Sequence, residues 1–232
     1  MGSSAFDRPS GAIVASVGDL LTFARMHLRE GVHAGLRVLS AQAVQSMQTP
    51  VADMPRLAEW SQSHGLGWVR DDLYELPVIG HDGATIGQTA ALRLVPSHGL
   101  GFAVMCNSEH SPSFRQDVLR EVLDALGMPS WPRDGWEATK VPDRAIAGRY
   151  EATGMTIDVR IEDDRAHLTM RYDDFIAPGQ VNETTFELVE GVDGRLRIRR
   201  DPDEPWLDVA FMRSADGKDV LYYHARAHLR VT

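Results

Sequence analysis

The stretch from Leu76 to Ser108 constrains the fold most strongly, because it predicts three consecutive strands separated by turns. Their expected ranges are Leu76–His81, Gln88–Val95 and Leu100–Asn107. Along the second strand the side chains alternate with a period of two, as in a strand with one covered face. The residues between the second and third strands are Pro-Ser-His-Gly, a compact turn that predicts an antiparallel hairpin.

A glycine-rich segment with one histidine connects the first two strands. Gly80, Gly83 and Gly87 surround His81. A glycine allows a ligand to approach the backbone where a Cβ would collide, and imidazole is the side chain that changes charge closest to neutral pH. The segment is therefore a candidate for the edge strand of an active site.

Composition narrows the classes of partner. The 232 residues are 43% hydrophobic, which is enough for a core in one domain or two. The formal net charge is −9 and the basic residues are dispersed, which argues against nucleic acid as the main partner. No apolar run approaches the roughly 18 residues of a membrane span, and no signal peptide opens the chain. The compartment is left open between cytoplasmic and exported.

Amphipathic helices are expected on both sides of the three-strand stretch. The first follows Ser16, an N-cap with Asp19 at the third helical position, and ends before Gly31. The second begins after Ser40 and ends before Pro50. These helices would flank an antiparallel sheet, which predicts an α+β fold.

The third helix is expected between Ser113 and Gly127. Its predicted apolar face consists of Phe114, Val118, Val122 and Leu126. Two histidines near the first helix, His27 and His33, are expected at the surface or at helix ends. The single cysteine, Cys106, cannot form an intramolecular disulfide and is expected to be a buried thiol.

The order of these motifs resembles the C-terminal half of the serine β-lactamase/penicillin-binding-protein-like superfamily. The similarity extends from about Pro9 to Leu126 and includes, besides the His-Asp-Gly triplet, the segments Gly11–Gly31, Leu39–Pro50 and His64–Asp72. In that superfamily a Lys-Thr-Gly or His-x-Gly triplet lines the catalytic cleft. The resemblance implies a serine hydrolase acting on an ester, amide or D-amino peptide, with no cofactor.

The resemblance also assigns roles to residues. His81 and Gly83 would line the cleft, and the backbone N–H of Ala84 would stabilise the oxyanion of an acyl-transfer reaction. Asp82, at the variable position of the triplet, would point away from His81 in a strand and have a lesser role. Asp82 and Thr85 are further candidates for substrate contact.

Two more residues have a functional and a structural interpretation. Trp60 is either a substrate-facing wall of the cleft or a packed side chain. His64 is either close to the cleft or a structural residue in a turn.

The superfamily's Ser-x-x-Lys and Tyr/Ser-x-Asn motifs are missing from this sequence. The only lysines are Lys140 and Lys218, without a serine three residues earlier, and the only asparagines are Asn107 and Asn182, without Tyr or Ser two residues earlier. We therefore interpret the chain as the second half of such a protein, inactive by itself. The strand Leu100–Asn107 would then have an exposed edge that pairs with the missing half or with a second copy.

The last part of the chain predicts a second domain. The proposed division is 1–127 for the β-lactamase-like portion, 128–144 for a linker and 145–232 for an eight-stranded antiparallel barrel. Eight strands are expected in the barrel: Gly148–Thr153, Met155–Glu162, Ala166–Tyr172, Phe175–Val181, Thr185–Glu190, Leu196–Arg200, Trp206–Arg213 and Val220–Val231.

The barrel resembles the lipocalin-like domain appended to many superfamily members. It offers an alternative function, a non-catalytic module that binds a small apolar ligand or a partner. His224 and His228 share a face of one expected strand but are too far apart to form a metal pair, and no other spacing predicts a metal site. A degenerate relative without chemistry is a third hypothesis.

Overall fold

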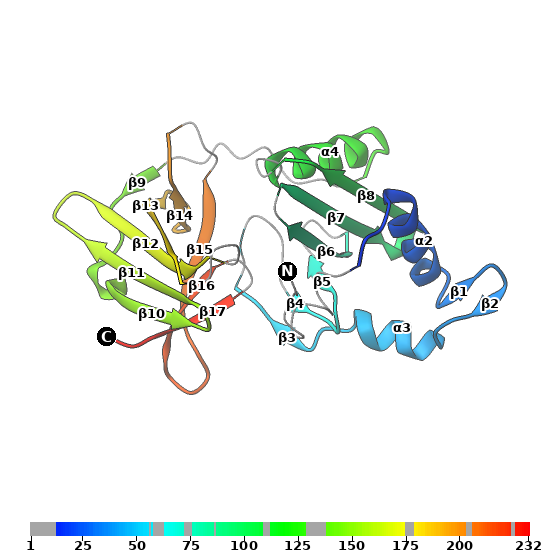
Figure 1. Ribbon diagram of the computed structural model, residues 1–232, viewed down its shortest axis with the longest axis horizontal. Helices are drawn as coiled ribbons and strands as arrows, with labels where there is room; N and C mark the ends of the chain where they lie inside the picture. Colours follow the sequence, from blue (N-terminus) through cyan, green and yellow to red (C-terminus); the bar gives the residue numbers. More distant parts are fainter. Residues whose placement is uncertain are drawn as a thin grey trace. The chain divides into compact units, whose positions relative to one another are not determined.

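The computed structural model describes residues 13–55, 57, 63–71, 76–85, 87–108, 112–128, 138–174, 179–202, 206–223 and 226–232. The chain divides into two compact units, Met1–Met54 with Trp60–Pro132 and Pro55–Glu59 with Arg133–Thr232. The predicted α+β class is confirmed (Figure 1). In the described part of the chain, no helix is both long and apolar enough to span a membrane.

The first unit is built on a six-stranded antiparallel sheet in the order β3-β4-β5-β6-β7-β8. The strands are β3 (Ala52–Asp53), β4 (Ser63–His64), β5 (Val69–Asp71), β6 (Val78–Thr85), β7 (Gln88–Val95) and β8 (Leu100–Cys106). The expected β7–β8 hairpin is confirmed, and its turn is the 3₁₀ segment η2 (Pro96–His98) with Gly99 at φ 62°. Strand β6 is longer at its C-terminal end than expected, so the His-Asp-Gly triplet lies within a strand.

Helix α2 (Val17–Leu28) begins at the predicted capping box. The Asp19 amide donates to Ser16 Oγ at 3.2 Å, and the Ser16 amide donates to Asp19 Oδ2 at 2.8 Å. After the helix, Gly31 has φ 88° and its amide donates to Met26 O at 2.8 Å. A Cβ there would lie 2.2 Å from Leu39 O, so both conformation and space require glycine.

Helix α3 (Ala41–Gln48) begins at the predicted N-cap. The Ala43 amide donates to Ser40 Oγ at 3.0 Å, and Val44 is buried. Strands β1 (Val32–His33) and β2 (Leu36–Arg37) form a small separate hairpin between α2 and α3.

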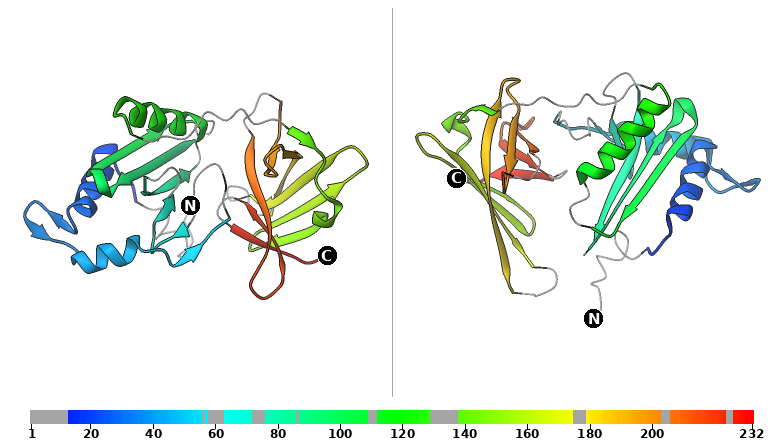
Figure 2. Two further views of the ribbon diagram at one scale, coloured as in Figure 1. Left: turned by 180° about the vertical axis from the view of Figure 1, so that it is seen from behind. Right: turned by 90° about the horizontal axis from the view of Figure 1, so that it is seen from above.

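The two faces of the sheet are covered by different helices. Helix α2 packs on one face, where the buried cluster is Ala24, Trp68, Ile79, Leu92 and Leu94. Helix α4 (Pro112–Ala125) packs on the other, where the buried cluster is Leu76, Val78, Val95, Leu119 and Leu123. Figure 2 shows α2 and α4 on opposite sides of the strands. We call these the α2 face and the α4 face.

The predicted apolar face of α4 is wrong. Phe114 and Leu126 are exposed, whereas Leu119 and Leu123 are buried against the sheet. The side chain of Arg115, one turn before Leu119, is also largely covered, at 11% exposure. The buried stripe of α4 therefore begins with a charged residue, Arg115. This residue can be covered because it pairs with a carboxylate of the sheet.

His27 lies in the last turn of α2, as one of the two expectations for it had it, but it is buried rather than at the surface. The residue is 2% exposed, and its ring lies 4.6 Å from the Phe23 ring and 5.0 Å from the Trp68 ring, centroid to centroid. Neither ring nitrogen has a hydrogen-bond partner among the described residues. Burial lowers the pKa of His27, because the charged imidazolium would lose its hydration.

The second unit is an antiparallel barrel, as predicted; the sequence left it closed or half-open, and the structure shows that it is closed. Its circular order is β12-β11-β10-β17-β16-β15-β14-β13, and β13 returns to pair with β12. The strands are β10 (Gly148–Ala152), β11 (Met155–Ile161), β12 (Ala166–Asp173), β13 (Val181–Gly191), β14 (Leu196–Arg199), β15 (Leu207–Arg213), β16 (Asp219–Tyr223) and β17 (Arg226–Arg230). Strand β9 (Ala138–Lys140), within the expected linker, adds to β13, and the 3₁₀ turn η3 (Arg144–Ile146) precedes β10.

The number of barrel strands was predicted correctly, but only because two errors cancel: one strand too many was expected before β13, and one too few at the end of the chain. Of the expected strand Phe175–Val181 only the last residue is in a strand, the long β13 that also contains Thr185–Glu190; residues 179–180 are not in a strand, and 175–178 are outside the described residues. The expected strand Val220–Val231 is a hairpin of β16 and β17, paired at Tyr223 and Arg226. Residue 224, one of the two histidines weighed as a metal pair, is outside the described residues.

Side chains of the barrel's own strands pack in its interior. The buried cluster consists of Tyr150, Ile157, Val159, Ala166, Leu168, Met170, Leu188, Ile198, Val209, Leu221 and Tyr223. His228 is fully buried, with Nδ1 3.3 Å from Leu221 O and Nε2 3.2 Å from Met155 Sδ. Cross-strand ion pairs such as Arg149–Asp158 and Arg171–Glu183 lie outside this cluster, at partly exposed positions.

Replacing His27 by phenylalanine should reduce the acid sensitivity of the first unit. Because the folded state lowers the His27 pKa, its contribution to stability is complete above about pH 6.5, the unfolded value, and is lost as pH falls below it. Thermal unfolding at pH 8 and pH 5 should show a smaller loss in His27→Phe than in the unmodified chain. His33→Gln, at an exposed position, is the control; equal losses in all three proteins would contradict the argument.

Candidate active site

His81 lies in β6, directly opposite Leu92 of β7. Opposed side chains in an antiparallel pair share a face, so His81 is on the α2 face, and its side chain is exposed. Its Nδ1 is 2.6 Å from Asp82 O. A carbonyl oxygen only accepts, so Nδ1 donates, and in the neutral ring Nε2 is the accepting nitrogen.

The two glycines around His81 have different surroundings. A Cβ on Gly83 would meet no atom within 4 Å, so the strand is open there. A Cβ on Gly80 would lie 2.1 Å from Leu92 O and 2.9 Å from Arg93 Cδ. There is therefore open space at Gly83, whereas Gly80 is required by the packing of β7, which sequence reasoning missed.

Ala84 and Thr85 complete β6. Both pair with β7, Ala84 with Thr89 and Thr85 with Gln88, close to the end of the ladder. Ala84 is exposed. The Thr85 side chain and all of Trp60 are outside the described residues, so the structure gives no position for these two predicted contacts.

The side chains of Asp82 and His81 do not lie together in the site. Successive residues of a strand point to opposite faces, and Asp82 is on the α4 face. There its Oδ1 is 2.6 Å from Arg93 Nη1 and its Oδ2 is 3.5 Å from Arg115 Nη2.

His64 lies in β4, two strands from β6, and is half-buried. Its Nε2 has no hydrogen-bond partner among the described residues. Burial lowers the pKa of His64 first, and the charge of a protonated His81 lowers it further. The two histidines are therefore close enough to interact electrostatically, and His64 stays neutral over a wider pH range.

Sequence reasoning missed the basic residues behind the triplet. Arg93 lies in the middle of an apolar strand and is 7% exposed. A lone arginine between Ala91 and Val95 signals a carboxylate on a neighbouring strand, since an unpaired charge is rarely buried. That signal was available from the sequence; the partner's identity was not.

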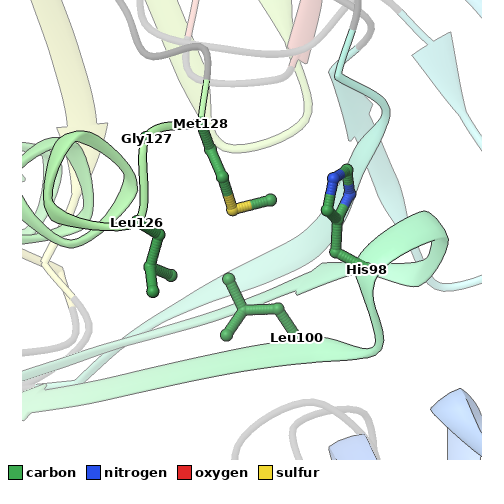
Figure 3. Close-up of a pocket in the computed structure, with 5 residues that line it drawn as sticks. All are labelled: His98, Leu100, Leu126, Gly127 and Met128. Atoms are coloured by element: carbon green, nitrogen blue, oxygen red, sulfur yellow. The ribbon is translucent and has the colours of Figure 1, made fainter.

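A hollow of about 410 Å³ lies elsewhere in this unit (Figure 3). It is lined by His98, Leu100, Leu126, Gly127 and Met128, from the β7–β8 turn and the end of α4. None of the predicted site residues lines it. Among the described residues, no group of three or more His, Cys, Asp or Glu is placed to hold a metal ion.

Comparisons with known proteins show the family of the chain and similar folds. The Beta-lactamase family model matches residues 1–127. Penicillin-binding protein 4 of Amycolatopsis lactamdurans is 37% identical over 153 residues, which is 63% of this chain and 40% of that protein. Crystal structures of SurE with and without D-Leu superpose with TM-scores of 0.64 and 0.63 at 24% identity, covering 94% of this chain and 50% and 48% of theirs.

The fold and the His-x-Gly strand define a chain of the β-lactamase and penicillin-binding-protein class. The family match covers more than half of the residues, so the chain belongs to the Beta-lactamase family. It spans 40% of the curated relative and about half of the solved structures.

Alanine substitutions should separate the roles of the two glycines. Neither has a positive φ, so space alone decides. Gly80→Ala should destabilise the first unit by about 1–3 kcal/mol, the usual range for overpacking. Gly83→Ala should change stability by no more than about 0.5 kcal/mol. Denaturant unfolding measures both, and equal effects would refute this assignment.

Proposed function

We propose that this chain supplies one wall of the active site of a β-lactamase-related serine hydrolase, which transfers or hydrolyses the acyl group of an ester, amide or D-amino peptide. The nucleophilic serine would be on polypeptide outside this chain. The observation that carries the proposal is the placement of His81 and Gly83 on the accessible α2 face of β6, with open space at Gly83. It occurs in a member of the Beta-lactamase family that lacks Ser-x-x-Lys.

The roles follow from the chemistry of acyl transfer. Negative charge develops on the carbonyl oxygen, and a preorganised backbone N–H stabilises it by several kcal/mol. The Ala84 amide is proposed as one such donor. The neutral His81 ring, with Nδ1 donating to Asp82 O, offers Nε2 as an acceptor; the protonated ring would bind a substrate carboxylate.

The names of the relatives support only a broad class of substrate. The curated relative is a penicillin-binding protein, and one SurE crystal structure contains D-Leu. Both are compatible with a small-molecule or peptide acyl substrate for this chain. His64, close to His81 and neutral, is proposed to contribute to the same site.

The partner in this proposal is a β-strand that extends the sheet. Strand β8 is the last strand of the sheet among the described residues, and its seven residues, LGFAVMC, carry no charge and no proline. All of them are partly exposed. Natural edge strands are normally protected by charges, proline or bulges, so this edge is suited to pairing. The remainder of the protein is the proposed partner, and a second copy is its substitute when the chain is isolated.

The alternative, a binding module built on the barrel, has less support. Eleven buried side chains pack together inside the barrel, and barrels of this size are commonly filled in this way. No described feature of the barrel favours a ligand over this packing. The third hypothesis, a degenerate relative that has lost its catalytic activity, can be distinguished from the first only by an activity measurement.

The isolated chain should show neither a burst nor turnover with nitrocefin or p-nitrophenyl esters, because it has no serine activated by a lysine. A longer reading frame of the same gene that includes Ser-x-x-Lys should be active. In that longer protein His81→Ala should lower kcat by about 10²–10⁴-fold, the range for a lost proton-transfer group, while Asp117→Asn, in an ion pair with Arg120 on α4, should not. Burst kinetics from the isolated chain would refute the division of the active site.

Edge pairing through β8 should be sensitive to one charge. Met105 is 44% exposed in β8 and Met212 is 43% exposed in β15. Met105→Lys should weaken association in sedimentation, since a lysine on an edge strand opposes pairing, and Met212→Lys should leave it unchanged. A monomeric unmodified chain, or equal effects of the two substitutions, would count against this partner.

A further inference from the structure

A group of charged side chains lies on the α4 face, directly behind the proposed active-site strand. Asp82 of β6 pairs with Arg93 of β7 at 2.6 Å and faces Arg115 of α4 at 3.5 Å. The side-chain exposures are 8% for Arg93, 11% for Arg115 and 34% for Asp82. One carboxylate thus connects two neighbouring strands and the helix that covers them.

Asp71 completes the charge balance of this group. It is buried at the end of β5 and attracts the Arg93 guanidinium. Two carboxylates and two guanidinium groups make the cluster formally neutral. Burial lowers the pKa of Arg93 and Asp82 opposes this, because the carboxylate offsets part of the cost of burying the guanidinium charge. Removing one partner of such a group leaves an uncompensated buried charge.

Gly80 makes the cluster sterically possible. It is directly opposite Arg93 in the β6–β7 ladder, and a Cβ at this position would lie 2.9 Å from Arg93 Cδ. The stem of Arg93 therefore passes over the bare Cα of Gly80 toward Asp82. In the sequence Gly80-His81-Asp82-Gly83, the first and third residues serve the α4 face, and the second and fourth lie on the α2 face.

The cluster is connected to the His81 ring through one peptide group. The carbonyl oxygen that accepts from His81 Nδ1 belongs to Asp82 itself. That peptide precedes Gly83 and lies in the middle of the β6–β7 ladder, between the fourth and fifth of its seven residue pairs. Because the carboxylate and the carbonyl oxygen belong to the same residue, holding the Asp82 carboxylate from behind restrains the peptide that orients His81 and leads to the Ala84 amide.

We propose that Asp82 is a positioning residue: clamped by Arg93 and Arg115, it sets the tautomer and orientation of His81 and the direction of the Ala84 amide from the face opposite to the substrate. The catalytic consequence of this inference rests on the proposed function. The geometry of the cluster does not. It replaces the expectation that Asp82 contacts substrate. It also makes α4, through Arg115, part of the support of the active site.

The test is a comparison of Asp82→Asn with the unmodified chain by NMR and hydrogen exchange. In the unmodified chain, ¹⁵N shifts should show the His81 tautomer protonated at Nδ1. In Asp82→Asn, the ring should become a mixture of tautomers, and the Gly83 and Ala84 amides should exchange at least about tenfold faster. Asp82→Glu, which keeps the charge, should restore much of the unmodified behaviour.

Two controls separate positioning from general stability. Val95→Ala removes a buried side chain from the same α4 face, and it should lower the Tm without changing the His81 tautomer. Asp117→Asn breaks the exposed Arg120 pair on α4 and should change neither. If Asp82→Asn does not fold, Arg115→Gln removes the longer of the two contacts and should give a smaller change of the same kind.

An unchanged His81 tautomer and unchanged exchange in Asp82→Asn, or equal changes in Val95→Ala, would overturn the proposal. The readouts use the isolated chain and require no activity, so a failure of the proposed function leaves them interpretable. In the longer active protein, Asp82→Asn should lower kcat with little change in KM. If the NMR changes occur and kcat is unaffected, the positioning stands and the catalytic role of His81 is refuted.

Discussion

The antiparallel pairing of β6 with β7 is the constraint on which the first unit depends. Its register places His81 opposite Leu92 and Asp82 opposite Ala91, so consecutive residues serve opposite faces of one sheet. The α2 face keeps an exposed imidazole beside an open glycine. The α4 face buries the charges that hold the same strand. A shift of β6 by one residue would exchange its two faces, separating Asp82 from Arg93 and Arg115 and placing the histidine on the α4 face.

The barrel depends on a different feature, the closure of its sheet into a circle of strands. Strand β13 is long enough to pair with β12 at one end and with β14 and β9 at the other, and this removes a free edge from the circle of eight strands. Its interior packs large side chains together. The sheet of the first unit is open by comparison, because β8 ends it among the described residues. The barrel therefore closes without a further strand, whereas the described sheet of the first unit ends at the edge strand β8.

Much of the fold could be predicted because the signals are local. The capping box at Ser16 and the hairpin turn at Pro96 involve residues within a few positions of one another. Errors arose where neighbours distant in sequence decide. The α4 helix offered two possible stripes, and the stripe containing Arg115 is buried because Asp82 lies opposite it. His27 looks like a surface residue until Phe23 and Trp68 cover it.

By itself, the sequence determined the α+β architecture, an eight-stranded barrel and the strand that carries the histidine, and the order of its motifs indicated the class of protein by resemblance. These follow from residue order, alternation and turn chemistry, which act over a few residues. Only the tertiary structure decided that Gly80 makes room for Arg93, that Asp82 pairs with Arg93, and that α4 supports that carboxylate through Arg115. The physical reason is that a buried charge must find its counter-charge in space, and the partner is set by strand register and helix packing rather than by proximity along the chain.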